Sequence, residues 1–274
     1  MKRLGIVTRA VLATGSIVII GVALLLFFPV PMVHYEHHHA LANAPKLTQT
    51  KHGRAGDPIN IGLAGTEKEI IQAMSEAAWV PADPITLRTS LGIVASVLLS
   101  RPYPMAPVSD LYLWNRKQDL AFEQTLGMSA TRRHHVRFWC ANQYAVDGRP
   151  LWIGAATFDE SVGISRTAGG ITHRISWDVD EERDTIIRTL MNAGQLVEIY
   201  QVTGIGSGLP RRNGGGDWYC TDGELTVGVI SHNNVVQMAE PTQMRNPPFV
   251  EVKMHLWTWT RHVLGPWRAH LLAR

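Results

Sequence analysis

The feature that most constrains this chain is an uncharged apolar stretch close to its beginning. Residues 10–33 contain no charged side chain, whereas Lys2, Arg3 and Arg9 precede them. About 20 apolar helical residues span the hydrocarbon core of a bilayer, so this stretch predicts a transmembrane helix. Because the cations lie only on its N-terminal side, residues 1–9 are expected in the cytoplasm. The sequence therefore predicts an inner-membrane protein whose remaining chain is periplasmic or extracellular.

A cleaved signal peptide is the alternative interpretation of the same stretch. Small residues stand at cleavage-site spacing at Ala40 and Ala42, and again at Ala42 and Ala44. The apolar core of a signal peptide runs about 7–15 residues, whereas this stretch is longer and ends well before those alanines. The length favours an uncleaved anchor, with the lipid bilayer as a partner.

Charge and cysteine content narrow the function classes. The net charge of +3, from 26 cations and 23 anions, has its source in the three N-terminal cations, so the exported part is near neutral. No basic excess indicates nucleic-acid binding. Cys140 and Cys220 follow aromatic residues in strand-like sequence, and both a disulfide and two buried thiols stay open. No Cys/His grouping with zinc-finger spacing occurs, no metal-binding residue is predicted, and the cofactor stays unknown.

The distribution of helical and strand-like segments predicts one α+β domain over residues 58–238, with a mostly antiparallel sheet. The polar residues 34–57 are predicted as a juxtamembrane linker, and residues 239–274 as a Pro-rich loop and a basic, Trp-containing helix. That helix either lies on a membrane surface or packs on the domain. Strand-like sequence occurs at residues 59–63, 111–114, 119–123, 134–140, 151–158, 196–202 and 226–230. The second and third of these segments are predicted to form one hairpin, and the fourth and fifth another.

Two helices carry clear end signals. Thr66 and Glu69 stand at capping-box spacing before apolar residues with a helical period. Residues 178–192 begin with several acids, which favour the positive end of the helix dipole, and Gly194 stands where a C′ glycine is expected. A further, more buried helix is predicted over residues 87–99.

The first candidate site is a basic stripe on the strand that follows Arg132. Side chains alternate between the two faces of a strand, so Arg133, His135 and Arg137 share one face while His134 faces the core. Arginine binds carboxylate or phosphate with two hydrogen bonds, and histidine exchanges a proton near neutral pH. The stripe predicts an anion platform, and an exposed strand face with ordinary cross-strand charge pairs is the alternative.

Two further segments could carry chemistry. Arg166, His173 and Asp178 resemble the spacing of membrane phosphatidate phosphatases, but each gap is one residue too long, so we interpret this as coincidence and the acids near Asp178 as helix capping. The glycine-rich residues 204–216 include adjacent arginines and could form an anion-binding nest or simply a mobile loop. No helix signal follows the glycines, which excludes a dinucleotide site.

Many motifs, in the order in which they follow one another along the chain, resemble the LssY C-terminal domain family over about residues 56–230. They include Gly56-Asp57-Pro58-Ile59-Asn60, Gly65-Thr66-Glu67, Trp79-Val80-Pro81-Ala82-Asp83-Pro84, Arg133-His134-His135-Val136-Arg137, Ile171-Thr172-His173 and Arg212-Asn213-Gly214-Gly215-Gly216-Asp217. The resemblance implies a bacterial, membrane-linked domain of unestablished biochemical role. Where the family usually has a second histidine after His173, this chain has Arg174.

Two functions stay open. The preferred one is an envelope module that binds an anionic ligand, a lipid headgroup, or a membrane-protein or envelope partner without chemistry. The alternative is a hydrolase of an envelope or lipid phosphoester, with His135 or His173 as acid or base and Arg137 and Arg212 holding the phosphoryl group. The candidate ligand-binding residues are Glu123, Arg133, Arg212, Asn213 and Asp217. Convergence of these side chains on one pocket would favour the enzyme.

Overall fold

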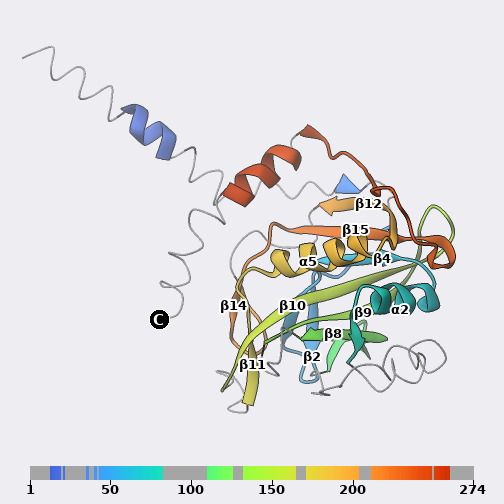
Figure 1. The fold of residues 1–274 in the computed structure, drawn as a ribbon. Helices are drawn as coiled ribbons and strands as arrows, with labels where there is room; N and C mark the ends of the chain where they lie inside the picture. Colours follow the sequence, from blue (N-terminus) through green and yellow to red (C-terminus); the bar gives the residue numbers. More distant parts are fainter. Residues whose placement is uncertain are drawn as a thin grey trace, which may run out of the picture. The chain divides into compact units, whose positions relative to one another are not determined.

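The computed structural model forms two compact units, Met1–Val33 and His34–Arg274, and each is described by itself (Figure 1). The described residues are 13–19, 21, 35–36, 40–41, 43–82, 110–125, 132–164, 171–203, 211–248 and 250–259.

The predicted transmembrane helix over residues 10–33 is wrong. Among the residues that the structure describes, no helix is both long and apolar enough to cross a membrane. The described helical run in that stretch covers residues 13–19. The fold class is therefore corrected to a mixed α+β protein without the predicted spanning helix.

The second unit is built on a ten-stranded sheet with the order β1-β12-β15-β4-β10-β9-β8-β5, where β11 also pairs with β10 and β16 with β12. Neighbouring strands are antiparallel except for β4 with β15 and β12 with β16, which are parallel. The strands are β1 (Tyr35–Glu36), β4 (Ile61–Ala64), β5 (Val80–Pro81), β8 (Leu120–Thr125), β9 (Arg133–Tyr144), β10 (Pro150–Ile164), β11 (Ile171–Ile175), β12 (Leu196–Thr203), β15 (Glu224–Ile230) and β16 (Thr242–Gln243). The predicted mostly antiparallel sheet is confirmed.

A second sheet has the order β3-β2-β6-β7, and β13 pairs with β14. These strands are β2 (Leu47–Thr50), β3 (Ala55–Pro58), β6 (Leu111–Leu113), β7 (Arg116–Lys117), β13 (Arg211–Arg212) and β14 (Trp218–Tyr219). Strands β1 and β2, and nearly all of β3, come from the stretch predicted as a linker. The predicted pairing of residues 111–114 with 119–123 is wrong, because Trp114 and Asn115 turn the chain with φ of +50° and +59°. Positive φ at both positions is typical of a two-residue type I′ turn, so β6 pairs with β7 and β8 joins the large sheet.

Both predicted end signals are confirmed in helices α2 (Glu67–Glu76) and α5 (Val179–Asn192). The Thr66 hydroxyl accepts the backbone N–H of Glu69, and the Glu69 carboxylate accepts the backbone N–H of Thr66. The Asp178 side chain accepts the N–H groups of Asp180 and Glu181, which caps α5. The helix predicted over residues 87–99 lies outside the described residues.

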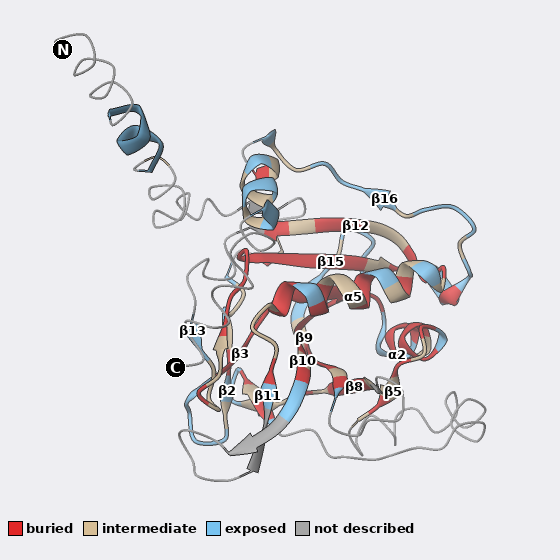
Figure 2. Ribbon diagram, turned by 60° about the vertical axis from the view of Figure 1, so that its left-hand side comes forward, coloured by how far each residue is buried: buried red, intermediate tan, exposed pale blue. Residues whose placement is uncertain are grey.

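The central strands of the large sheet are buried on both faces (Figure 2). The apolar cluster on the side of α2 and α5 includes Ile70, Met74, Phe138, Ile186 and Leu190. The cluster on the opposite face, where the second sheet contributes Leu111 and Leu113, includes Trp139, Ile153, Tyr200 and Leu225. Because alternate residues of β9 enter both clusters, neither face of this strand is left to solvent along its central part.

The structure also bears on the two cysteines and on the helix near the C-terminus. Cys140 and Cys220 are both free, so the disulfide alternative is wrong. Residues 250–259 are helical. In that helix the Trp257 indole N–H donates to Asp180 Oδ2 over 3.3 Å, and Lys253 Nζ lies 2.6 Å from Glu224 Oε1. These bonds hold the described part of the helix, residues 250–259, against the domain.

Candidate functional site

Three adjacent strands bring a set of polar side chains together on the sheet face that lies opposite α2 and α5. In the antiparallel register, Glu123 of β8 stands beside His135 of β9, which stands beside Thr157 of β10. Arg133 stands beside Asp159 in the same way. All five residues are at most 3% exposed. We call these residues the β9 cluster.

Charges in the β9 cluster are paired with one another. Arg133 Nη1 lies 3.0 Å from Glu123 Oε2, and Arg133 Nε lies 3.0 Å from Asp159 Oδ2. Burial raises the pKa of Glu123, and the charge of Arg133 opposes that rise. Buried ions are tolerated only when partners and hydrogen bonds replace the lost water. The arrangement is a closed internal network.

His135 has both ring nitrogens engaged within this network. Its Nε2 lies 2.8 Å from Asp159 Oδ1, and its Nδ1 lies 3.2 Å from Arg137 Nη1. Because a guanidinium only donates, Nδ1 must accept and Nε2 must carry the proton. Arg137 Nη1 also lies 3.6 Å from Asp57 Oδ2, and burial lowers the pKa of Arg137. The imidazole therefore presents no free nitrogen to a substrate in this geometry.

The glycine-rich segment adds one predicted site residue to this network and leaves another outside it. Asn213 Nδ2 donates to Asp57 Oδ1 over 3.2 Å, and Asn213 Oδ1 accepts the N–H of Asp217. Arg212 is exposed, and its guanidinium lies 4.4 Å from the centre of the Trp218 ring. Residues 213–217 thus form a tight turn that is bonded to β3.

His173 is not placed in this network. Its backbone pairs with Val162 across β11 and β10, and its side chain lies outside the described part of the structure. Of the predicted site residues, the structure brings together Glu123, Arg133, His135, Arg137 and, through Asp57, Asn213.

The comparison with protein families shows to which family this chain belongs. The family model described as LssY C-terminus matches residues 41–225, more than half of the chain. The chain belongs to this family. The resemblance expected from the sequence motifs is confirmed. Neither curated proteins nor solved structures give a match.

The sequence did not predict a second histidine–carboxylate pair in this LssY C-terminal domain, between His134 and Glu182. His134 Nδ1 lies 2.6 Å from Glu182 Oε2 of α5, and its ring packs 4.7 Å from that of Phe158. Within the described residues, the other oxygen of Glu182 has no hydrogen-bond partner, and burial raises the pKa of this carboxyl. Helical spacing could have predicted that Glu182 is buried, because Glu182 precedes the buried Ile186 by one turn and therefore faces the sheet.

A further ion network joins α5 to the loop before β15. Arg183 makes two hydrogen bonds to Asp222, of 2.9 and 3.1 Å, and lies 3.4 Å from Asp180 Oδ1. Asp180 also accepts a 2.7 Å bond from the Thr221 hydroxyl. In the described ranges, no three His, Cys, Asp or Glu side chains are arranged to hold a metal ion.

This network predicts a pH dependence of stability. Burial, with the nearby carboxylate of Asp222, raises the pKa of Asp180 to about 7. The folded state then holds a proton that the unfolded chain, with an aspartate pKa of about 3.9, releases. We expect the free energy of unfolding to fall as pH rises from about 4 to about 7, by at most about 1.4 kcal/mol per pH unit.

Urea denaturation of the wild type and of the isosteric variant Asp180→Asn at several pH values tests this expectation. The fall should be shallower in the variant, because Asp180 no longer contributes to it, whereas the exposed control Asp110→Asn should keep the wild-type slope. An unchanged slope in Asp180→Asn would assign the proton to another group.

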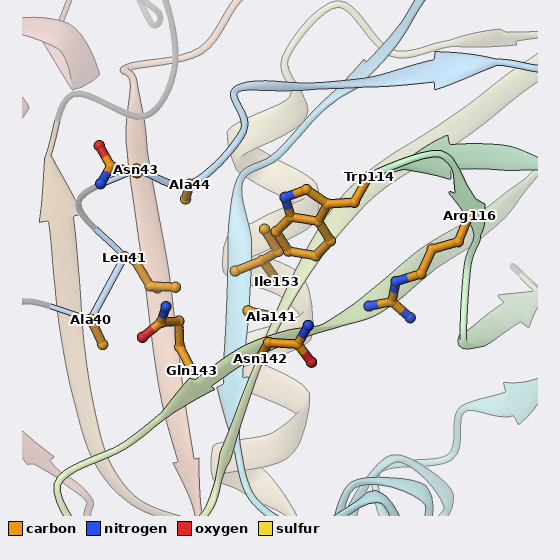
Figure 3. A pocket seen from close by; sticks show the side chains of 10 residues that line it. All are labelled: Ala40, Leu41, Asn43, Ala44, Trp114, Arg116, Ala141, Asn142, Gln143 and Ile153. Carbon is orange, nitrogen blue, oxygen red and sulfur yellow. The ribbon is translucent and has the colours of Figure 1, made fainter.

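A cavity of about 540 Å³ lies apart from these networks (Figure 3). Its walls come from the β6–β7 turn, the end of β9, β10 and the segment before β2. The residues that line it are Ala40, Leu41, Asn43, Ala44, Trp114, Arg116, Ala141, Asn142, Gln143 and Ile153. Between the pairs Tyr144–Pro150 and Cys140–Trp152 the register shifts, and Asn142 has φ of +51°. This β-bulge turns the end of β9 toward the cavity, and bulges are frequent beside binding sites.

Proposed function

We propose that this LssY C-terminal domain is a ligand-binding module and that its ligand occupies the cavity beside Trp114. One observation carries the proposal: the cavity has about 540 Å³. Small-molecule sites typically have roughly 300–1,000 Å³ and combine apolar walls with a few polar groups. Leu41 and Ile153 supply buried apolar walls here, and Asn142 and Gln143 supply exposed amides.

The β9 cluster supports binding over phosphoester hydrolysis. A general base needs a nitrogen or oxygen within reach of its substrate, and a phosphoryl site needs guanidinium groups that can turn toward the ligand. His135 engages both nitrogens inside the protein, and Arg133 bonds two buried carboxylates. Their buried positions are those of a structural network.

A thermal-shift screen of the full chain tests the proposal. The panel contains neutral saccharides, phosphate monoesters, amino acids and fatty acids. A ligand at 100 times its Kd stabilises the folded state by about 2.7 kcal/mol, which raises Tm by several degrees. We expect at least one class to stabilise the wild type and Trp114→Ala to lose that shift.

The matched control is Trp259→Ala, since Trp259 is 59% exposed and lies outside the cavity. It should keep the full shift. A panel without any stabilising compound, or a shift that survives Trp114→Ala, would contradict a ligand at this cavity.

A further inference from the structure

We infer that the cavity binds a neutral, polyhydroxylated ring, a saccharide, with one ring face against the indole of Trp114. The inference rests on the proposed function and names the ligand class for the same cavity. Three properties of the described lining residues lead to it: a fixed aromatic platform, amide groups without internal partners, and the absence of an unpaired charge in this part of the lining.

The platform is held in place before any ligand arrives. Trp114 opens the two-residue turn between β6 and β7, and its side chain is 46% exposed. The Arg116 guanidinium lies 5.6 Å from the centre of the indole ring. That guanidinium is itself fixed by the Asp119 carboxylate and the carbonyl of Cys140. A preorganised aromatic side chain loses little conformational entropy on binding.

The hydrogen-bonding groups are placed on the β9 side of the cavity. In Figure 3, the amides of Asn142 and Gln143 lie on this strand, across the cavity from Trp114. Within the described residues, neither side chain makes a hydrogen bond in the protein. Each amide offers two N–H donors and a carbonyl acceptor. Hydroxyl groups, which both donate and accept, match this mixture.

The charges of the described lining residues disfavour an ionic ligand. Among the lining residues that the structure describes, the charged side chain is Arg116, and it forms an ion pair with Asp119. A phosphate or carboxylate would therefore meet no unpaired cation among the described lining residues, which argues against the anionic ligand expected from the sequence. A wholly apolar ligand would leave the amides of Asn142 and Gln143 without partners at a free-energy cost.

A pyranose ring satisfies all three properties. Its axial C–H groups form an apolar face with a slightly positive edge, which is attracted to the negative face of an aromatic ring. Its hydroxyls lie around the rim, where the amides of Asn142 and Gln143 can reach them. The buried side chains of Leu41 and Ile153 bound the remaining space.

Isothermal titration of the full chain with chosen probes tests the inference. The probes are glucose, N-acetylglucosamine and their β-1,4-linked disaccharides, with cyclohexanol as the ring without further hydroxyls and glucose 6-phosphate and glucuronate as anionic analogues. We expect a neutral saccharide to bind and cyclohexanol not to bind. The anionic analogues should bind no more tightly than glucose.

Variants locate the binding. Trp114→Ala should weaken the Kd at least tenfold, and Trp114→Phe should retain part of the affinity. Asn142→Gly removes the amide while permitting the positive φ at that position, and should weaken binding severalfold. Trp259→Ala should bind as the wild type does, and circular dichroism of each variant checks that it is folded.

The possible failures are distinguishable. If another class of the thermal-shift panel binds in a Trp114-dependent manner and no saccharide does, the ligand class is wrong and the proposed function stands. Saccharide binding that is unchanged in Trp114→Ala also overturns the inference. If no class binds at Trp114, both fail together.

Discussion

Replacing Arg133 by methionine is expected to cost about 3–5 kcal/mol of the free energy of unfolding. Methionine fills much of the arginine volume but leaves Glu123 and Asp159 buried without their cation, since both carboxylates lie 3.0 Å from the same guanidinium. Urea denaturation followed by circular dichroism measures the loss. A domain of ordinary stability, about 5–15 kcal/mol, would lose a large part of its margin.

The neighbouring Arg132 supplies the matched control, because it is exposed. Arg132→Met should change the free energy of unfolding by no more than about 1 kcal/mol, because it removes only an exposed cation–π contact with Phe158 among the contacts described for it. The triple variant Glu123→Gln, Arg133→Met, Asp159→Asn removes both orphaned charges and should recover part of the loss. Equal stabilities of Arg132→Met and Arg133→Met would show that the β9 cluster contributes nothing to folding.

Asn60→Ala is expected to cost about 3 kcal/mol or more, the second large effect. Asn60 is fully buried between β3 and β4 and makes three side-chain hydrogen bonds. Its Nδ2 donates to the carbonyls of Ala156 and Val179 over 3.0 and 2.8 Å, and its Oδ1 accepts the N–H of Ala156 over 2.9 Å. Alanine leaves the N–H and the C=O of Ala156 buried and unpaired, at about 1–3 kcal/mol each before relaxation, whereas the Val179 carbonyl keeps its helical hydrogen bond within α5.

Urea denaturation again gives the measurement, with Asn43→Ala as the control at an exposed position. The control should be nearly neutral. Asn60→Asp keeps the acceptor and loses the donors, so it should also destabilise the domain. A loss below about 1 kcal/mol in Asn60→Ala would mean that water replaces the amide and that Asn60 does not join β4, β10 and α5.

Local signals in the sequence were sufficient for the helices and for side-chain alternation. The capping box of Thr66 and Glu69 and the N-cap of Asp178 each depend on a few neighbouring residues, so they could be predicted. Alternation on β9 correctly put Arg133, His135 and Arg137 on one face. It could not show that this face is buried, because the strands that form the second sheet are remote in sequence from β9.

The cavity could not be found from the sequence for a similar reason. Trp114 belongs to a turn, Asn142 to a β-bulge and Leu41 to a segment that composition marked as a linker. No spacing connects them, and a bulge moves side chains away from the positions that simple alternation predicts. The candidate catalytic residues were chosen from the sequence by their chemical type. Whether such a side chain can act on a ligand depends on whether its polar atoms are already bonded within the protein, which the sequence does not show.

The parallel pairing of β4 with β15 sets the order in which this domain can assemble. β4 is made early, but one of its neighbours is β10 and the other is β15, which is among the last strands to leave the ribosome. Until then one edge of β4 offers unpaired backbone groups to other chains. Contacts between residues so remote in sequence form slowly. The centre of the sheet is therefore completed only after β15, at Glu224–Ile230, has been synthesised, and a truncation before Glu224 would leave it open.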